Sequence, residues 1–188
     1  MTTILDIGCG KNKTPGAIGI DFNANTTADM VHDLNAFPWP LSDNQFDRIV
    51  CKHIVEHIVD FVRFVEEVHR VAKPGAFVEI VTPHFSNRYS YTDPTHLRHL
   101  SLFAFDYFID QPPFNPSPVS RAFETQSPLV DFYSPVRFKK IRAFLRFGRP
   151  FRLCGLQWLA NRFPYFYEAY LVWIFPARDL YFTLQVVK

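Results

Sequence analysis

The sequence is poor in glycine, cysteine and long apolar runs, and each shortage excludes a class of protein. Its 188 residues hold 7 glycines against 15 prolines, which disfavours flexible linkers and extensive disorder. Three well-separated cysteines do not make a disulfide framework, so we expect free thiols in a reducing, cytoplasmic compartment. The longest nearly uncharged stretch, 169–177, is about half the roughly 20 residues that a membrane-spanning helix needs. No charged and apolar leader precedes the first apolar run, so we expect no export signal.

Charged and aromatic residues are unevenly distributed along the chain. Residues 132–167 carry eight Lys and Arg but no Asp or Glu, although the net charge of the whole chain is only +2. Of the 32 aromatic residues, 22 follow Leu100, so the second half is basic and aromatic. The length suits one domain, 1–188, in which we distinguish a first half at 4–86 from a second half at 87–188.

Short apolar runs bounded by turn residues predict strands in the first half. They lie at residues 4–7, 17–20, 29–32, 48–51 and 76–82. Between the last two runs, apolar residues recur at helical spacing from Ile58 to Ala72, where Lys73-Pro74-Gly75 ends the pattern. Two strands connected by a helix pair in parallel, so the sequence predicts an α/β fold.

The second half predicts fewer elements. The sequence favours a short helical run from an N-cap at Ser101 to Phe108, strands near 138–144 and 181–187, and a helix within 156–175.

Three successive strand ends carry residues suited to a nucleotide. After the first strand, Gly8 and Gly10 make a turn whose backbone a ligand can approach closely. Asp21 ends the second strand, where a carboxylate can accept hydrogen bonds from both ribose hydroxyls. Asp33 and Leu34 follow the third strand, suited to an adenine amino group and its ring. Each pattern alone is also typical of an ordinary turn or strand-end cap, and only their conjunction is specific.

In order along the chain, these motifs resemble those of class I S-adenosylmethionine-dependent methyltransferases. The matching segments are LDIGCG, IGIDF, HDL, FDRIVCKHIVEHI and RVAKPGAFVEIVTPHF, in register over residues 4–86. The resemblance implies a Rossmann-like, mainly parallel seven-stranded sheet with helices on both faces, whose antiparallel terminal strand is 181–187. It also implies that 4–86 binds S-adenosylmethionine and that 87–188 forms the acceptor side.

The resemblance assigns contacts to each part of that cofactor. Residues at the four strand ends would line, in chain order, its methionine end, ribose, adenine and methyl group. They are Asp6, Gly8, Cys9, Gly10, Asp21, Phe22, Asp33, Leu34, Lys52 and His53.

One departure from the family concerns the first crossover. Only nine residues, Gly8 to Gly16, link the first two strands, whereas a helical crossover usually needs about a dozen or more. We therefore expect the first helix to be shortened or absent. A helix N-terminus normally helps to bind anions at this place, so Lys11, Asn12 or Lys13 would have to substitute for it.

The letters from His53 to His57 also match a zinc pattern. His53-x-x-Glu56-His57 is the H-x-x-E-H motif of inverted zinc peptidases, in which helical spacing places both histidines on one face. Because His53 falls at the end of a strand, that spacing need not apply, and we expect no metal.

Histidines are the candidate general bases. The loop 84–99 is dense in groups that bind protons, anions or metals, although Asp93-Pro94-Thr95 is also typical of an ordinary turn. If the acceptor is a hydroxyl, four histidines near the proposed methyl group can remove its proton: His53, His57, His84 and His96.

The sequence therefore predicts a methyltransferase acting on a small-molecule or lipid-like acceptor, with an anionic acceptor as one option. The basic aromatic segment 132–167 would form a wall of the acceptor pocket or contact a membrane surface peripherally; alternatively it is core plus a solvated face. A catalytically inactive cofactor-binding partner subunit and an RNA-binding methyltransferase remain alternatives. Nucleic-acid substrates are disfavoured because Cys51-Lys52-His53-Ile54 stands where base-amino methyltransferases carry a DPPY-like tetrad. The oligomeric state and the acceptor itself are not determined by the sequence.

Overall fold

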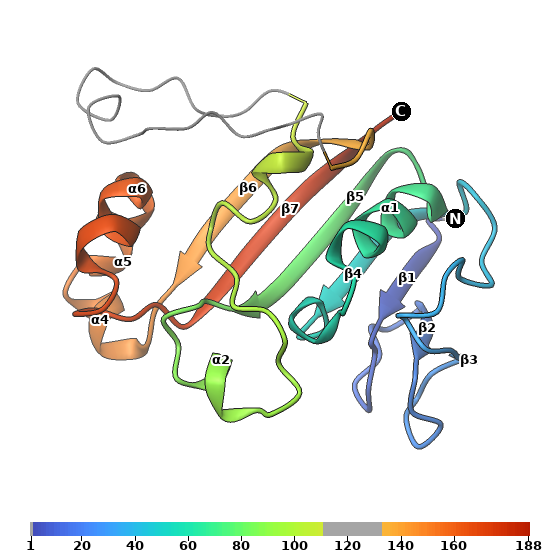
Figure 1. The fold of residues 1–188 in the computed structure, drawn as a ribbon, viewed down its shortest axis with the longest axis horizontal. Helices are drawn as coiled ribbons and strands as arrows, with labels where there is room; N and C mark the ends of the chain where they lie inside the picture. Colours follow the sequence, from blue (N-terminus) through green and yellow to red (C-terminus); the bar gives the residue numbers. More distant parts are fainter. Residues whose placement is uncertain (1, 111–132) are drawn as a thin grey trace.

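The computed structural model describes residues 2–110 and 133–188, and its strands form one seven-stranded sheet (Figure 1). The strands are β1 (Ile4–Ile7), β2 (Ile18–Asp21), β3 (Met30–Val31), β4 (Phe46–Lys52), β5 (Ala72–Pro83), β6 (Arg137–Arg146) and β7 (Asp179–Val187). Their order is β3-β2-β1-β4-β5-β7-β6. Strands β1 to β5 pair in parallel, and β7 is antiparallel to both β5 and β6. The predicted fold class, a mainly parallel Rossmann-like sheet with an antiparallel terminal strand, is confirmed.

The strand order reverses between β1 and β4. From β1 the chain passes outward to β2 and β3, then returns to the other side of β1 to form β4 and β5. In open α/β sheets, ligands bind outside the carboxyl ends of the strands at such a switch point. The topology therefore directs attention to the loops that follow β1, β4 and β5.

Helix α1 (Phe61–Val71) connects β4 to β5 and covers one face of the sheet. Its N-cap, Asp60, accepts a hydrogen bond from the Arg63 amide at 3.0 Å, and its buried side chains include Phe64 and Val68. The sequence predicted this helix from Ile58. It begins three residues later because the preceding residues form a separate 3-10 turn, η1 (Val55–His57).

The connection between β1 and β2 is a loop without a helix. Within this loop, residues 8–17, the Thr14 amide donates to the buried Asp6 carboxylate at 2.6 Å. Lys13 packs so closely on Gly19 that a Cβ there would lie 2.6 Å from its side chain. Helices were predicted on both faces with the first crossover helix shortened or absent. That helix is absent, because this connection is too short to hold one.

The second half packs against the outer edge of the sheet. The elements α4 (Arg149–Leu153), α5 (Leu156–Arg162), α6 (Pro164–Phe166) and η3 (Tyr167–Leu171), a π-helical turn, connect β6 to β7 and lie beside β6 (Figure 1). Asn161 on α5 exchanges two hydrogen bonds with the backbone of Leu145, at 2.7 and 2.8 Å. The single helix predicted within 156–175 is interrupted at Phe163, whose non-helical backbone precedes Pro164.

Between β5 and β6 the chain makes only short helical turns. They are α2 (Tyr89–Thr92) and η2 (Asp106–Phe108). The Ser101 hydroxyl accepts a hydrogen bond from the Phe103 amide at 2.9 Å, as predicted for an N-cap, but the run to Phe108 is not a continuous helix. Asp106 forms a buried ion pair with Lys140 of β6, which ties this segment to the sheet edge.

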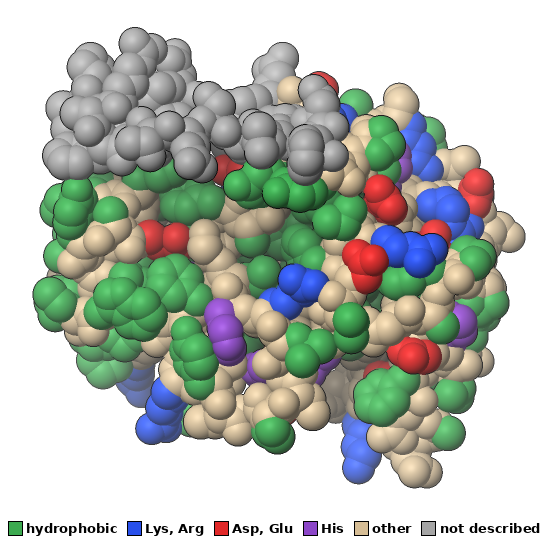
Figure 2. Space-filling view, in the orientation of Figure 1, with side chains coloured by type: hydrophobic (Ala, Val, Ile, Leu, Met, Phe, Trp, Pro, Cys, Tyr) green, Lys and Arg blue, Asp and Glu red, His purple; other side chains and the backbone are tan. Residues whose placement is uncertain are grey.

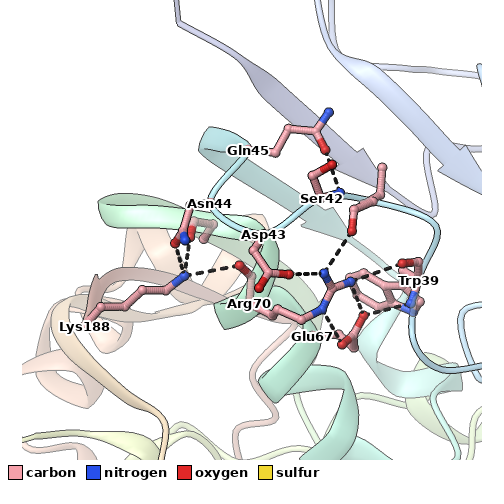
Figure 3. Close-up of polar contacts among 10 residues, drawn as sticks. Trp39, Ser42, Asp43, Asn44, Gln45, Glu67, Arg70 and Lys188 are labelled. Carbon is pink, nitrogen blue, oxygen red and sulfur yellow. Dashed lines mark hydrogen bonds and ion pairs between the residues drawn. The ribbon is translucent and has the colours of Figure 1, made fainter.

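Arg70, near the end of α1, forms hydrogen bonds with the segment that precedes β4 (Figure 3). Its guanidinium donates to both carboxylate oxygens of Glu67, to Asp43 and to the backbone carbonyls of Trp39 and Leu41. The Trp39 indole in turn donates to the carbonyl of Leu34 at 3.2 Å. Arg70 is thus one of several contacts that hold the segment after β3 to α1, together with the Trp39 amide on Glu67 and the Trp39 ring on Phe64.

Among the residues that the structure describes, no helix has both the length and the apolar character needed to span a bilayer.

Candidate functional site

The turn after β1 requires both of its glycines. Gly8 and Gly10 have φ angles of +67° and +54°, in the left-handed region that side chains with a Cβ rarely adopt. A Cβ at Gly8 would lie 2.7 Å from Ile54, whereas a Cβ at Gly10 would meet no atom within 4 Å. Gly8 is thus needed for packing, and Gly10 leaves open space beside the backbone. Burial raises the pKa of the intervening Cys9 thiol, so Cys9 has the character of an unreactive core residue.

The carboxylates predicted to contact a nucleotide bind backbone amides in this structure. Asp21 accepts hydrogen bonds from the amides of Gly10 and Asn23, each at 2.9 Å, and this holds the first turn against the end of β2. Each of its oxygens keeps a second lone pair that can accept from a ligand hydroxyl. Phe22 beside it is 69% exposed, as a side chain that stacks on a ligand would be before binding.

The third strand end is arranged differently. Asp33 accepts from the Asn35 amide at 2.9 Å, as in an Asx turn, and Leu34 is buried. Of the substitutes considered for the missing helix, Lys13 pairs with Asp29 at 2.6 Å instead. Lys52, at the end of β4, is exposed, with its Nζ 3.5 Å from the Thr14 hydroxyl.

A cleft of about 640 Å³ opens at the carboxyl ends of β4 and β5. Its wall comprises residues from the ends of these strands, the start of β7 and the loop 87–96. They are His53, Glu56, His57, Pro83, Asn87, Tyr89, Thr92, Asp93, Pro94, His96, Arg178 and Asp179. The volume lies within the range of about 300–1,000 Å³ typical of small-molecule sites.

Three of the four predicted histidines line this cleft. His53 has a φ of +53°, uncommon for a residue other than glycine, and its Nδ1 lies 3.3 Å from Oε1 of Glu56. The Glu56 carboxylate raises the pKa of His53, against the opposing effect of burial. The rings of His57 and His96 meet edge to face, with their centroids 4.6 Å apart.

His84 does not belong to the cleft lining. It is fully buried, with Nδ1 2.7 Å from the Ser86 hydroxyl and Nε2 3.1 Å from the Glu168 carboxylate. These contacts hold the end of β5 to η3, so His84 has the surroundings of a structural histidine.

Sequence reasoning missed several cleft residues. Asp179 pairs with Pro83 because β7 runs antiparallel beside β5, which brings the start of one strand to the end of the other. Burial raises the pKa of Asp179. The predicted antiparallel terminal strand was the signal that could have pointed to Asp179, and Asn87 belongs to the loop 84–99 that the sequence singled out, whereas Arg178 carried no local signal. Glu56 had been weighed only as part of the zinc pattern.

The described part of the basic aromatic segment, 133–167, divides between core and surface; residue 132 lies outside the described residues. Phe138, Phe147 and Tyr167 are buried, and burial raises the pKa of Tyr167 to about 12. Apolar side chains are exposed on the helices and the turn that follows them. This outer helical surface consists of Leu153, Trp158, Leu159, Phe163, Phe166, Tyr170, Trp173 and Ile174. Figure 2 shows hydrophobic side chains gathered over this side of the molecule.

Comparison with known proteins agrees with the motif at the strand ends. Residues 5–80, which contain the glycine turn and strands β1 to β4, match the family model of the methyltransferase domain. Over these residues the chain resembles class I S-adenosylmethionine-dependent methyltransferases, whose cofactor is S-adenosylmethionine.

Two curated relatives extend the match. A protein named "Probable S-adenosylmethionine-dependent methyltransferase" from Mycolicibacterium smegmatis is 30% identical over 122 residues, 52% of this chain and 46% of that protein. The 2-phytyl-1,4-naphthoquinone methyltransferase of Nostoc sp. is 27% identical over 110 residues, 45% of this chain and 48% of that protein. The chain spans about half the length of the curated relatives it matches.

Solved structures share the fold at low sequence identity. The YcgJ protein of Bacillus subtilis superposes with a TM-score of 0.59 at 15% identity, covering 100% of this chain and 92% of that one. An S-adenosylmethionine-dependent methyltransferase from Archaeoglobus fulgidus gives 0.55 at 19% identity, covering 98% and 86%. At such identities these likenesses establish the fold of the methyltransferase domain and leave its acceptor open.

Proposed function

We propose that this protein is an enzyme that transfers a methyl group from S-adenosylmethionine to a small-molecule or lipid-like acceptor. The observation that carries the proposal is the cleft at the carboxyl ends of β4 and β5, adjoining the switch point between β1 and β4. In this fold a ligand on the first strands and a second ligand in the cleft would meet near Lys52 and His53.

Within this proposal the first half of the chain binds the cofactor and the second half forms the rest of the acceptor site. Residues 4–86 bind the cofactor. Asp6 and the turn Gly8-Cys9-Gly10 contact its methionine end, and the other predicted residues contact its remaining parts. Asp21 accepts from the ribose hydroxyls with the lone pairs that its backbone partners leave free. Asp33, Leu34 and Phe22 surround the base. Residues 87–188 supply the rest of the acceptor site.

The chain's main task in methyl transfer would be alignment of the acceptor and exclusion of water. S-adenosylmethionine supplies a methyl group already activated by a sulfonium. His53 is placed to accept a proton from an acceptor hydroxyl, because it lies at the end of β4 and its Nδ1 is held beside Glu56. The strained backbone conformation of His53 holds its imidazole ring beside Glu56.

A lipid-like acceptor is supported by the outer helical surface. Within it, Leu159, Phe163, Phe166, Tyr170 and Ile174 recur every three or four residues, and Trp158 and Trp173 are about 70% exposed. Arg149, Arg152 and Arg162 are exposed on the same helices. Exposed aromatic and basic side chains together suit a membrane interface with anionic lipids, from which a hydrophobic acceptor would be taken. The named substrate of the Nostoc relative is a phytylated quinone, which is consistent with this class. We place the protein in the cytoplasm, at such a surface.

Calorimetry with S-adenosylhomocysteine tests the cofactor half of the proposal. We expect wild type to bind, and Asp21→Ala to lose about 1–3 kcal/mol of binding free energy, because ribose hydroxyls lose their acceptor. Glu79→Ala is the control, since it removes a partly exposed carboxylate within β5 that pairs with Arg48. No binding at millimolar ligand by folded wild type would refute the proposal.

Transfer of a labelled methyl group tests the catalytic half. We expect turnover with a quinol or another amphiphilic hydroxyl acceptor presented in vesicles, and a loss in His53→Gln. Cofactor binding without turnover on any acceptor class would favour a catalytically inactive partner subunit. Salt-sensitive RNA binding with methylation of RNA would favour the RNA-directed alternative.

A further inference from the structure

Three side chains on the cleft wall are placed as metal ligands. One ligand atom from each of Glu56, His57 and His96 lies within 4.8 Å of the other two. We propose that these residues bind a divalent transition-metal ion such as Zn²⁺. The site combines a residue pair from η1 with a histidine 39 positions later in the chain, so only the fold assembles it.

The Glu56 carboxylate provides an observation independent of that clustering. It is 1% exposed, and its Oε2 accepts a hydrogen bond from the Thr82 hydroxyl at 3.0 Å. Its Oε1 is buried, makes no hydrogen bond among the described residues, and has Nδ1 of His53 as a neighbour at 3.3 Å, which is a charged partner only when that ring is protonated. A buried carboxylate oxygen without a cationic partner is costly, and a bound metal ion would supply that partner while His53 is neutral.

Both imidazole rings are oriented as metal ligands usually are. Nδ1 of His57 lies 3.2 Å from the Thr95 carbonyl and 3.0 Å from the Thr95 hydroxyl, which itself donates to Asp93. Nδ1 of His96 lies 3.2 Å from the Ser90 carbonyl. Ligating histidines almost always donate one ring N–H to a carbonyl or carboxylate, which fixes the tautomer. With Nδ1 protonated in both rings, Nε2 carries the lone pair that coordinates.

The ligand chemistry selects the class of ion. Two imidazoles and one carboxylate suit zinc and iron, whereas calcium and magnesium prefer oxygen ligands alone. Bonds of about 2.0–2.2 Å place tetrahedral ligand atoms about 3.4 Å apart, so the three side chains need to move by about 1 Å to close on the ion. Three protein ligands leave a coordination position open toward the cleft, as at catalytic zinc sites.

This site differs from the zinc pattern in the sequence. His53 ends β4 and lies outside the group, so the spacing His53 to His57 is not the metal-binding element. The third ligand instead comes from the loop after β5, where the Asp93 carboxylate lies 3.7 Å from Nε2 of His96. The expectation of no metal rested on the position of His53 at a strand end, and the proposal replaces it with a site that does not use His53.

Equilibrium dialysis of the metal-free protein against buffered Zn²⁺ tests the proposal directly. We expect one Zn²⁺ per chain, with affinity reduced by more than about 100-fold in each of Glu56→Gln, His57→Gln and His96→Gln. His32→Gln is the matched control, because His32 is a partly exposed histidine whose ring bonds the Ala36 carbonyl away from the cleft. Binding to wild type no tighter than to His96→Gln would overturn the proposal.

A measurement on wild type removes any dependence on how the variants fold. Nitrogen-15 spectra of the histidine rings should show Zn²⁺ shifting Nε2 of His57 and His96 while His32 and His69 stay unchanged. Shifts confined to other histidines would refute the site. Because neither experiment uses S-adenosylmethionine, its outcome is independent of the proposed methyl transfer, and calorimetry with S-adenosylhomocysteine on the same samples tells the two failures apart.

Discussion

Replacing Arg70 with methionine tests whether one side chain holds the segment between β3 and β4. Methionine keeps much of the aliphatic bulk and the helix propensity but loses all five guanidinium hydrogen bonds shown in Figure 3. Two of these bonds go to Glu67, one to Asp43 and one each to the carbonyls of Trp39 and Leu41.

The magnitude follows from the burial of each partner. Glu67 is only 9% exposed, and loss of one partner of a buried ion pair costs about 3–5 kcal/mol. The Asp43 side chain is 67% exposed, so its pair contributes about 0–1 kcal/mol. Burial raises the pKa of Glu67, but the hydrogen bonds from Arg70 and the Trp39 amide outweigh it and the net pKa is lowered. Because the partners form one network, we expect a total loss of about 3–5 kcal/mol and no simple sum.

Urea unfolding monitored by circular dichroism measures this loss. The control is Arg63→Met on the same helix, where the guanidinium only stacks over the Phe37 ring at 4.9 Å and contributes about 0.5–1 kcal/mol. Adding Glu67→Gln to Arg70→Met should recover part of the loss, because the unpaired charge is then removed. Cofactor affinity should fall as well, since Trp39 positions Leu34. A loss below about 1 kcal/mol in Arg70→Met would refute this reasoning.

Three further substitutions have expected outcomes in the same unfolding assay. Gly8→Ala should cost more than Gly16→Ala, because both have positive φ but only at Gly8 would a Cβ lie 2.7 Å from a neighbouring side chain; equal losses would contradict this. Lys140→Met should destabilise by about 3–5 kcal/mol by leaving Asp106 buried and unpaired, and adding Asp106→Leu should restore most of it; no recovery would argue against the ion pair. Burial lowers the pKa of His69 below its ordinary 6.5, so the unfolded chain takes up that proton first. His69 makes its full contribution to the free energy of unfolding above about pH 6.5, and this contribution falls as the pH drops below that value. His69→Gln should therefore make the free energy of unfolding less dependent on pH in this range, and an unchanged pH dependence would show that His69 is not responsible.

The strands of the first half could be predicted from the sequence because their signals are local. Apolar runs bounded by turn residues lie close to the observed strands β1 to β5, and the glycine turn after β1 has the positive φ angles that its residues allow. The first helix was predicted to be shortened or absent because the connection between the first two strands is short, and the structure shows that it is absent. The second half was less predictable, because Phe163-Pro164 interrupts a helix that the apolar periodicity made continuous.

By itself, then, the sequence determined the fold class, and it indicated a resemblance to methyltransferases and the strand ends at which we propose that the cofactor binds. Only the tertiary structure decided which polar groups share the cleft. Strand β7 returns antiparallel to β5 and brings Asp179 to Pro83, and the loop after β5 folds back to place His96 beside His57. The tertiary structure also separated His84, buried against Glu168, from the histidines that face the cleft. The physical reason is that periodicity and turn chemistry act between near neighbours in the chain, whereas a site is made by contacts between residues far apart in it.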